Sequence, residues 1–126
     1  MSNGMHGPFM RSGVPVRQYL LDPYFAVLLT QVEGVGPVEL LHVLVVYKTG
    51  EPEPVFFVTA ELERGDTATE PRVPCLCVFA EDGTHSHLER SAEWADVERF
   101  AARAVEMVKE RYGVTEVLPL HDTDPS

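Results

Sequence analysis

The sequence predicts a single α+β domain, in which an antiparallel β-meander of about five strands is covered on one face by one long C-terminal helix. Three observations predict this fold. Apolar segments separated by Gly, Pro and Asp run through the first two-thirds of the chain. After position 91 the apolar residues recur every three or four positions, which is the period of a helix. The length of 126 residues, 44% of them hydrophobic and 24% charged, is typical of one globular domain.

The predicted strands follow one another through the first two-thirds of the chain. Pro23 precedes the first strong strand, a position where a missing N–H is tolerated. The dipeptide Asp82-Gly83 is the strongest hairpin signal, because a two-residue type I′ turn needs positive φ at both positions. We expect strands at 16–21, 24–33, 38–48, 55–64, 75–81 and 84–89, the first being the weakest, and a short last strand at 114–118.

The two ends of the chain lack the apolar residues that a core requires. Residues 1–13 are rich in Gly, Met and Ser and are expected to form a disordered N-terminal segment. A tail over 121–126 is expected to be disordered as well. The predicted folded domain therefore spans 14–120.

One helix is predicted over 91–112. Ser91 is a suitable N-cap, and Glu93 and Asp96 lie near the positive end of the helix dipole. Gly113 fits the position after the last turn, where a left-handed residue ends a helix. The apolar stripe that must face the core consists of Trp94, Val97, Phe100, Ala101, Ala104, Val105, Val108 and Tyr112.

The charge and composition exclude several classes of function. The formal net charge is −10, from 20 acidic and 10 basic residues, which argues against DNA or RNA as a partner because nucleic-acid binding relies on clustered Lys and Arg. No apolar run reaches the ~18–20 residues that span a bilayer, and the N-terminal segment does not resemble a secretory signal. The chain contains 18 Val but no Ile, and 8 Arg against 2 Lys, which favours a GC-rich bacterial genome as its source.

Cys75 and Cys77 are two residues apart on one predicted strand, which places their Cβ atoms about 7 Å apart. A disulfide needs roughly 3.8 Å, so we expect two reduced cysteines in a cytoplasmic protein. Their apolar neighbours disfavour a nucleophilic cysteine, because apolar surroundings raise the pKa of a thiol. His42 lies between Leu41 and Val43 and is interpreted as a hydrogen-bonded core histidine. No catalytic residue and no cofactor are predicted.

His85 and His87 are the best metal-ligand candidates, because alternate residues on a strand present both imidazoles on one side. A two-residue turn before them would place His85 opposite Ala80. Both histidines would then lie on the face opposite Cys75 and Cys77, so a mixed Cys/His site is disfavoured.

A second type of metal site is left open by this register. It would combine His85 and His87 with a carboxylate from a neighbouring strand, Glu61 or Glu63. The alternative interpretation is a pair of solvent-facing hairpin histidines without a ligand.

The acidic residues suggest a function in protein binding. Residues 51–90 contain nine acidic and three basic residues, a net charge of −6. Within this segment Glu51, Glu53, Glu61 and Glu63 are predicted to bind a partner. The leading hypothesis is a small interaction module without catalytic activity, such as an adaptor, an immunity protein or a regulatory subunit. The alternative is a small enzyme or ligand-binding protein with a pocket on the sheet, including one with a His-based metal site.

Both faces of the central strands are apolar, which predicts that both are buried. In 38–47 one face carries Leu40, Leu44 and Val46, and the other carries Val43 and Val45. A single helix covers only one face, and soluble monomers rarely expose a large apolar patch. We therefore expect a homodimer, or a docked partner, on the second sheet face, unless the sheet curls strongly enough to bury that face itself.

Overall fold

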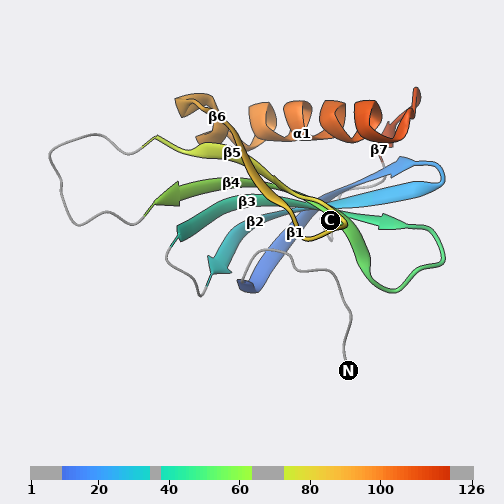
Figure 1. Ribbon diagram of the computed structural model, residues 1–126, viewed down its shortest axis with the longest axis horizontal. Helices are drawn as coiled ribbons and strands as arrows, with labels where there is room; N and C mark the ends of the chain where they lie inside the picture. The colour runs from blue at the N-terminus through green and yellow to red at the C-terminus, as the bar shows by residue number, and fades with distance from the viewer. Residues whose placement is uncertain (1–9, 35–37, 64–72, 120–126) are drawn as a thin grey trace, which may run out of the picture.

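The computed structural model describes residues 10–34, 38–63 and 73–119. Six consecutive strands form an antiparallel meander, and helix α1 (Val97–Tyr112) lies along one side of it (Figure 1). The predicted α+β class is confirmed, with six meander strands instead of five. These strands are β1 (Met10–Leu21), β2 (Tyr24–Gly34), β3 (Val38–Lys48), β4 (Pro54–Glu63), β5 (Cys75–Phe79) and β6 (His85–Arg90). A short β7 (Leu118–Pro119) pairs with β1, so that the sheet order is β6-β5-β4-β3-β2-β1-β7.

Strand β1 begins earlier than the sequence predicts. Residues 10–13, expected to be disordered, belong to β1 and pair with the end of β2. The register between the two strands shifts three times between Met10 and Arg17. Such irregularities bend and twist a strand, and they hide the simple alternation by which a strand is recognised in a sequence. The remaining segments expected to be disordered, 1–9 and 121–126, lie outside the described residues.

The predicted single helix is divided in two by a second N-cap. Ser91 caps a short 3-10 helix, η1 (Ala92–Ala95), and its hydroxyl accepts a hydrogen bond from the Glu93 N–H at 3.1 Å. Asp96 then adopts an extended conformation, and its carboxylate accepts from the Glu98 N–H at 2.8 Å, which starts α1. Gly113, with φ of 67°, ends α1 as expected.

The main core lies between α1 and the sheet face that it covers. From the helix, Phe100, Ala104 and Val108 are fully buried. Trp94 is buried in the same core, and its indole N–H donates to the Glu89 carbonyl at 3.1 Å. The indole thereby joins η1 to β6. The sheet residues of this core include Leu28, Leu44, Val46, Val58, Ala60 and Leu76.

His42 has the structural role predicted for it. The side chain is buried, with Nδ1 at 3.2 Å from the Thr30 hydroxyl and Nε2 at 3.1 Å from the Ala95 carbonyl. The ring also lies against Phe100, with 5.5 Å between ring centroids. Both ring nitrogens are therefore satisfied, and the imidazole connects β2 and β3 to the end of η1.

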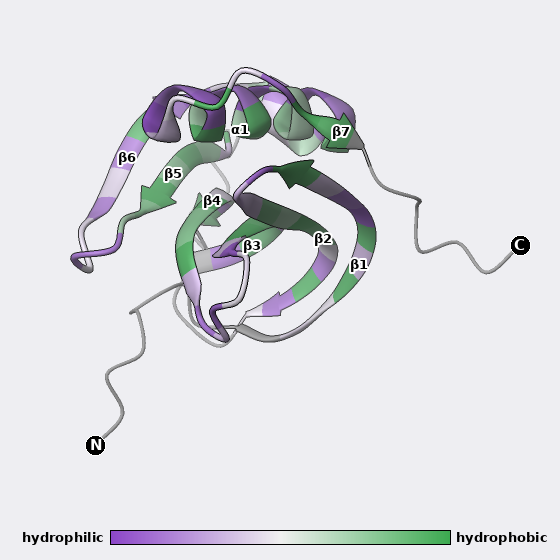
Figure 2. Ribbon diagram, turned by 90° about the vertical axis from the view of Figure 1, so that its right-hand side faces the viewer, coloured by the Kyte–Doolittle hydropathy of each residue, from purple (hydrophilic) through white to green (hydrophobic). Residues whose placement is uncertain are grey.

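The second sheet face is buried within the chain. The strands curl strongly (Figure 2), and the side chains of this face pack on one another in a second core made of Leu40, Val43, Val45 and Phe57, with Leu29, Val32, Tyr47 and Phe79 around it. Among the described residues only Val14, Leu88 and Leu118 are large exposed hydrophobics. The curl of the sheet therefore covers the apolar face that led us to expect a homodimer. Dimerisation stays a prediction, but an exposed apolar sheet face no longer supports it.

Candidate metal centre

The β5–β6 hairpin has a three-residue loop, not the expected two-residue turn. Ala80 N–H donates to the Thr84 carbonyl at 2.9 Å, and Gly83 N–H donates to the Ala80 carbonyl at 3.0 Å. Gly83 has a φ of 88°, and the Asp82 carboxylate accepts from the Thr84 N–H at 2.9 Å. This is a type I turn followed by a left-handed glycine, which is the commonest three-residue hairpin connection.

The extra loop residue reverses the predicted face of both histidines. His85 pairs with Phe79, not with Ala80, and His87 pairs with Cys77. A one-residue change of register moves every side chain of a strand to the other face of the sheet. The expected separation of the histidines from Cys77 is therefore wrong, because all three side chains lie on the same face.

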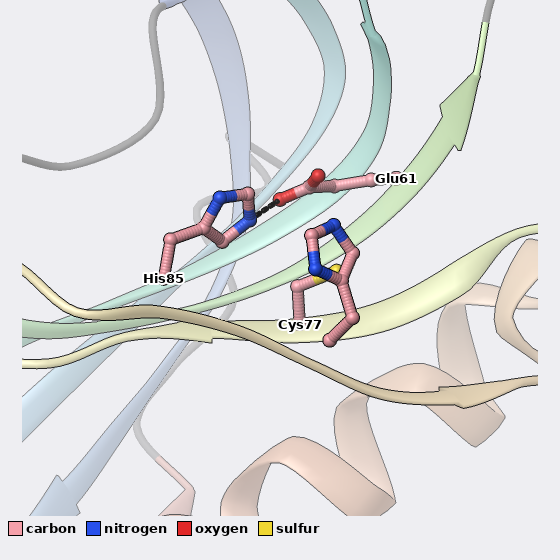
Figure 3. A group of neighbouring side chains, drawn as sticks. Glu61, Cys77 and His85 are labelled. Carbon is pink, nitrogen blue, oxygen red and sulfur yellow. Dashed lines mark hydrogen bonds and ion pairs between the residues drawn. The ribbon is translucent and has the colours of Figure 1, made fainter.

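Four potential metal ligands converge on this face. They are Glu61 of β4, Cys77 of β5 and His85 and His87 of β6, and their ligand atoms all lie within 4.8 Å of one another. Figure 3 shows Glu61, Cys77 and His85 on three adjacent strands. The sequence neighbours of Glu61 and Cys77 on these strands, Ala60 and Leu76, belong to the core under α1. Side chains alternate along a strand, so the cluster lies on the face away from the helix.

Glu61 is a buried carboxylate whose hydrogen bonding is incomplete. The residue is 3% exposed. Its Oε2 accepts from the Thr59 hydroxyl at 2.7 Å and lies 2.9 Å from Nε2 of His85. Its Oε1 is buried and has no hydrogen-bond partner among the described residues. A buried carboxylate oxygen without a partner is costly, and a cation is the ligand that compensates it best.

Cys77 does not have the chemistry of a free nucleophile. The side chain is fully buried, and its thiol donates to the Cys75 carbonyl at 3.6 Å. Burial raises the pKa of the Cys77 thiol far above its ordinary value, and the nearby Glu61 carboxylate raises it further. The group Cys77–His85–Glu61 contains the residue types of a nucleophilic triad, but a protonated, inaccessible thiol does not attack a substrate. A bound divalent cation, in contrast, deprotonates the thiol that coordinates it.

The two histidines connect this buried pair to solvent. His85 is 35% exposed and stacks on Phe79, with ring centroids 4.0 Å apart and an interplanar angle of 10°. The His87 ring lies 4.7 Å from that of His85, and its side chain is exposed. An ion can therefore reach the cluster from solvent on the side of β6.

The four residues offer the ligand types of a tetrahedral transition-metal ion, but they must move closer together to coordinate one. Zinc–ligand bonds of about 2.0–2.3 Å place the four ligand atoms roughly 3.3–3.8 Å apart. The cluster is about 1 Å wider than this. Rotation of the exposed His85 and His87 side chains would provide the contraction, while Glu61 and Cys77 are held by the buried strands.

The acidic residues predicted to bind a partner do not form one surface. Glu51 and Glu53 are exposed between β3 and β4, as expected. Glu61 is buried, so its assignment to a partner-binding surface is corrected, while its alternative role as a carboxylate beside His85 is supported by their contact. Glu63 ends β4, but its side chain lies outside the described residues.

The candidate ligand that the sequence analysis disfavoured is Cys77. The signal that could have identified it is the Ala80–Gly83 segment, which fits a type I turn with a glycine bulge as well as it fits a two-residue turn.

None of the helices in the described ranges is long and apolar enough to cross a membrane. Comparisons with protein families, with curated proteins and with solved structures found no match for the chain.

Proposed function

We propose that this protein binds one divalent transition-metal ion, zinc in particular, through Glu61, Cys77, His85 and His87. The observation that carries this proposal is the buried Glu61 carboxylate: its Oε1 has no hydrogen-bond partner in the described part of the chain, and one of its oxygens lies within 4.8 Å of the ligand atoms of Cys77, His85 and His87. Buried polar atoms are nearly always satisfied in proteins, and a cation bound among these four ligands would satisfy this one.

The donor set selects the class of ion. Two imidazoles, one thiolate and one carboxylate suit zinc and other first-row transition metals, whereas magnesium and calcium require a shell of oxygen ligands. The Thr59 hydroxyl donates a hydrogen bond that orients Glu61, and the Phe79 ring packs against His85. When bound, the ion would neutralise the buried Glu61 carboxylate and the Cys77 thiolate that forms on coordination.

Metal binding has more specific structural support than the expected acidic interaction surface. An interaction module would use Glu51 and Glu53, which are exposed, but Glu61 is not available to a partner. We retain partner binding and self-association as secondary proposals. A cytoplasmic location is part of the main proposal, because two free buried cysteines suit a reducing compartment.

The test is a measurement of zinc affinity by competition with a chromophoric chelator, on protein first stripped of metal. We expect one ion per chain. Cys77→Ala should weaken zinc binding about tenfold or more. Cys75→Ala is the matched control, because Cys75 is buried on the same strand but is not one of the four ligands. Cobalt should give a thiolate charge-transfer absorption in the wild type and in Cys75→Ala, but not in Cys77→Ala.

Two results would contradict the proposal. The first is a metal-free protein that does not compete with the chelator. The second is an equal loss of affinity in Cys75→Ala and Cys77→Ala, which would indicate a general disturbance of β5. His87→Ala provides a further test, because this side chain is exposed and its removal should cost affinity without disturbing the fold.

A further inference from the structure

Strand β6 is the most weakly anchored of the six meander strands. It lies at one edge of the sheet, and in the described part of the chain it pairs only with β5. Five of its six residues are exposed, and none of them belongs to either core. Its attachments include the backbone ladder, the contacts of His85 with Glu61 and Phe79, the hydrogen bond from Arg90 to the Val73 carbonyl, and the Trp94 indole that bonds to Glu89.

The backbone ladder of β6 is interrupted next to the metal ligands. Cys77 pairs with His87, but the next pair is Leu76 with Glu89, so Leu88 is an extra residue on β6. A bulge of this kind removes ladder hydrogen bonds locally. The side chain of Leu88 is half exposed and adds little burial. Strand β6 is therefore held most weakly to β5 at the bulge immediately after His87.

The proposed ligands are divided equally between this edge strand and the interior of the sheet. Glu61 and Cys77 are buried on β4 and β5, whereas His85 and His87 are exposed residues of β6. An ion coordinated by all four residues would cross-link three strands. To release β6 from the sheet, two metal–imidazole bonds would then have to break in addition to the ladder.

We infer, on the basis of the proposed metal site, that the bound ion fastens β6 to the sheet and that loss of the ion permits this strand to open locally. Opening requires less free energy than unfolding of the whole domain, because neither core contains a residue of β6. An open β6 exposes the backbone edge of β5, which is a template for pairing with another strand. Metal occupancy would in this way control whether the backbone edge of the apolar strand β5 is accessible to another strand.

Hydrogen exchange followed by mass spectrometry tests this inference on the full chain, with and without zinc. Zinc should slow the exchange of amides in β5 and β6 by about tenfold or more, while those of the β2–β3 ladder should change little. In His87→Ala the effect of zinc on β6 should be lost. In Glu53→Gln, which changes an exposed residue far from β6 in sequence, the effect should persist.

Alkylation of Cys75 gives a second readout that is independent of coordination. This thiol is buried on β5 opposite Arg90 of β6, and it is not one of the proposed ligands. Zinc should slow its reaction with iodoacetamide, because the reagent reaches Cys75 only when β6 opens. If zinc protected only Cys77 from alkylation, the result would show that Cys77 coordinates the ion but that the ion does not hold β6 against the sheet.

The possible outcomes separate the inference from the proposed function. Zinc binding in the competition assay together with selective protection of β5, β6 and Cys75 supports both. Zinc binding with unchanged exchange, or with equal slowing of all strands, overturns the inference and leaves the metal site intact. Absence of zinc binding in the competition assay overturns both.

Discussion

Replacing Glu61 by glutamine should stabilise the metal-free protein and at the same time remove its response to zinc. The wild-type carboxylate is 3% exposed, and among the described residues only its Oε2 has hydrogen-bond partners. Glutamine has the same shape, and its amide oxygen can still accept the hydrogen bond from the Thr59 hydroxyl. The substitution removes a buried charge but leaves a neutral group, which is a weaker ligand for a cation.

The size of the effect follows from the cost of the orphaned oxygen. A buried polar group without a partner costs about 1–3 kcal/mol, and a charged group costs more. The amide group that replaces Oε1 of Glu61 would also have no partner in the described ranges, so only part of this cost is recovered. We expect the free energy of unfolding to rise by about 1–2 kcal/mol, which corresponds to an increase in Tm of roughly 5–10 °C for a domain of this size.

Zinc should reverse the order of stability of the two proteins. A ligand at one hundred times its Kd stabilises the folded state by about 2.7 kcal/mol. Wild type with zinc should therefore be more stable than Glu61→Gln with zinc, although it is the less stable protein in the presence of a chelator.

The assay is urea denaturation of wild type and of Glu61→Gln, each measured once with a chelator and once with zinc. Glu53→Gln serves as the control for removal of one acidic charge at an exposed position. If Glu61→Gln were less stable than wild type in the chelator, the carboxylate would be a structural partner of Thr59 and His85 and the reasoning would fail. An undiminished stabilisation of Glu61→Gln by zinc would refute the assignment of Glu61 as a ligand.

Two further predictions concern residues outside the metal centre. His42→Ala should lower the free energy of unfolding by about 1–3 kcal/mol, because the Thr30 hydroxyl and the Ala95 carbonyl lose their partner. Its zinc affinity should equal that of wild type, since His42 is packed in the core on the α1 side, and a loss of affinity would contradict the separation of the two faces. Burial raises the pKa of Tyr112 to about 12, from an ordinary value of 10.0. The resulting stabilisation is fully present below pH 10 and is lost as the pH rises to 12, so urea titrations over this range should show falling stability, and Tyr112→Phe should show a smaller fall. An equal fall in both proteins would assign the alkaline instability to other groups.

Most of the fold can be predicted from the sequence because its strongest patterns are local. The helical spacing of Phe100, Ala104 and Val108 requires a buried helix face, and all three side chains are fully buried. Gly113 ends α1 as predicted. Local patterns failed where two signals compete, as at Asp96, whose carboxylate starts a new helix five residues after the predicted N-cap. They also failed in β1, where register shifts hide the alternation of its first residues.

The sequence by itself determined the α+β class, the buried role of His42 and the shared face of His85 and His87. Only the tertiary structure decided which residues those histidines meet. Asp82-Gly83 is compatible with a loop of two residues or of three, and the hydrogen bond from Ala80 to Thr84 selects three. That single residue brings Cys77 and Glu61 to the histidines. The curl that buries the second sheet face is likewise a property of the assembled strands. Register and curvature depend on how two or more strands pair, and no strand read alone contains that information.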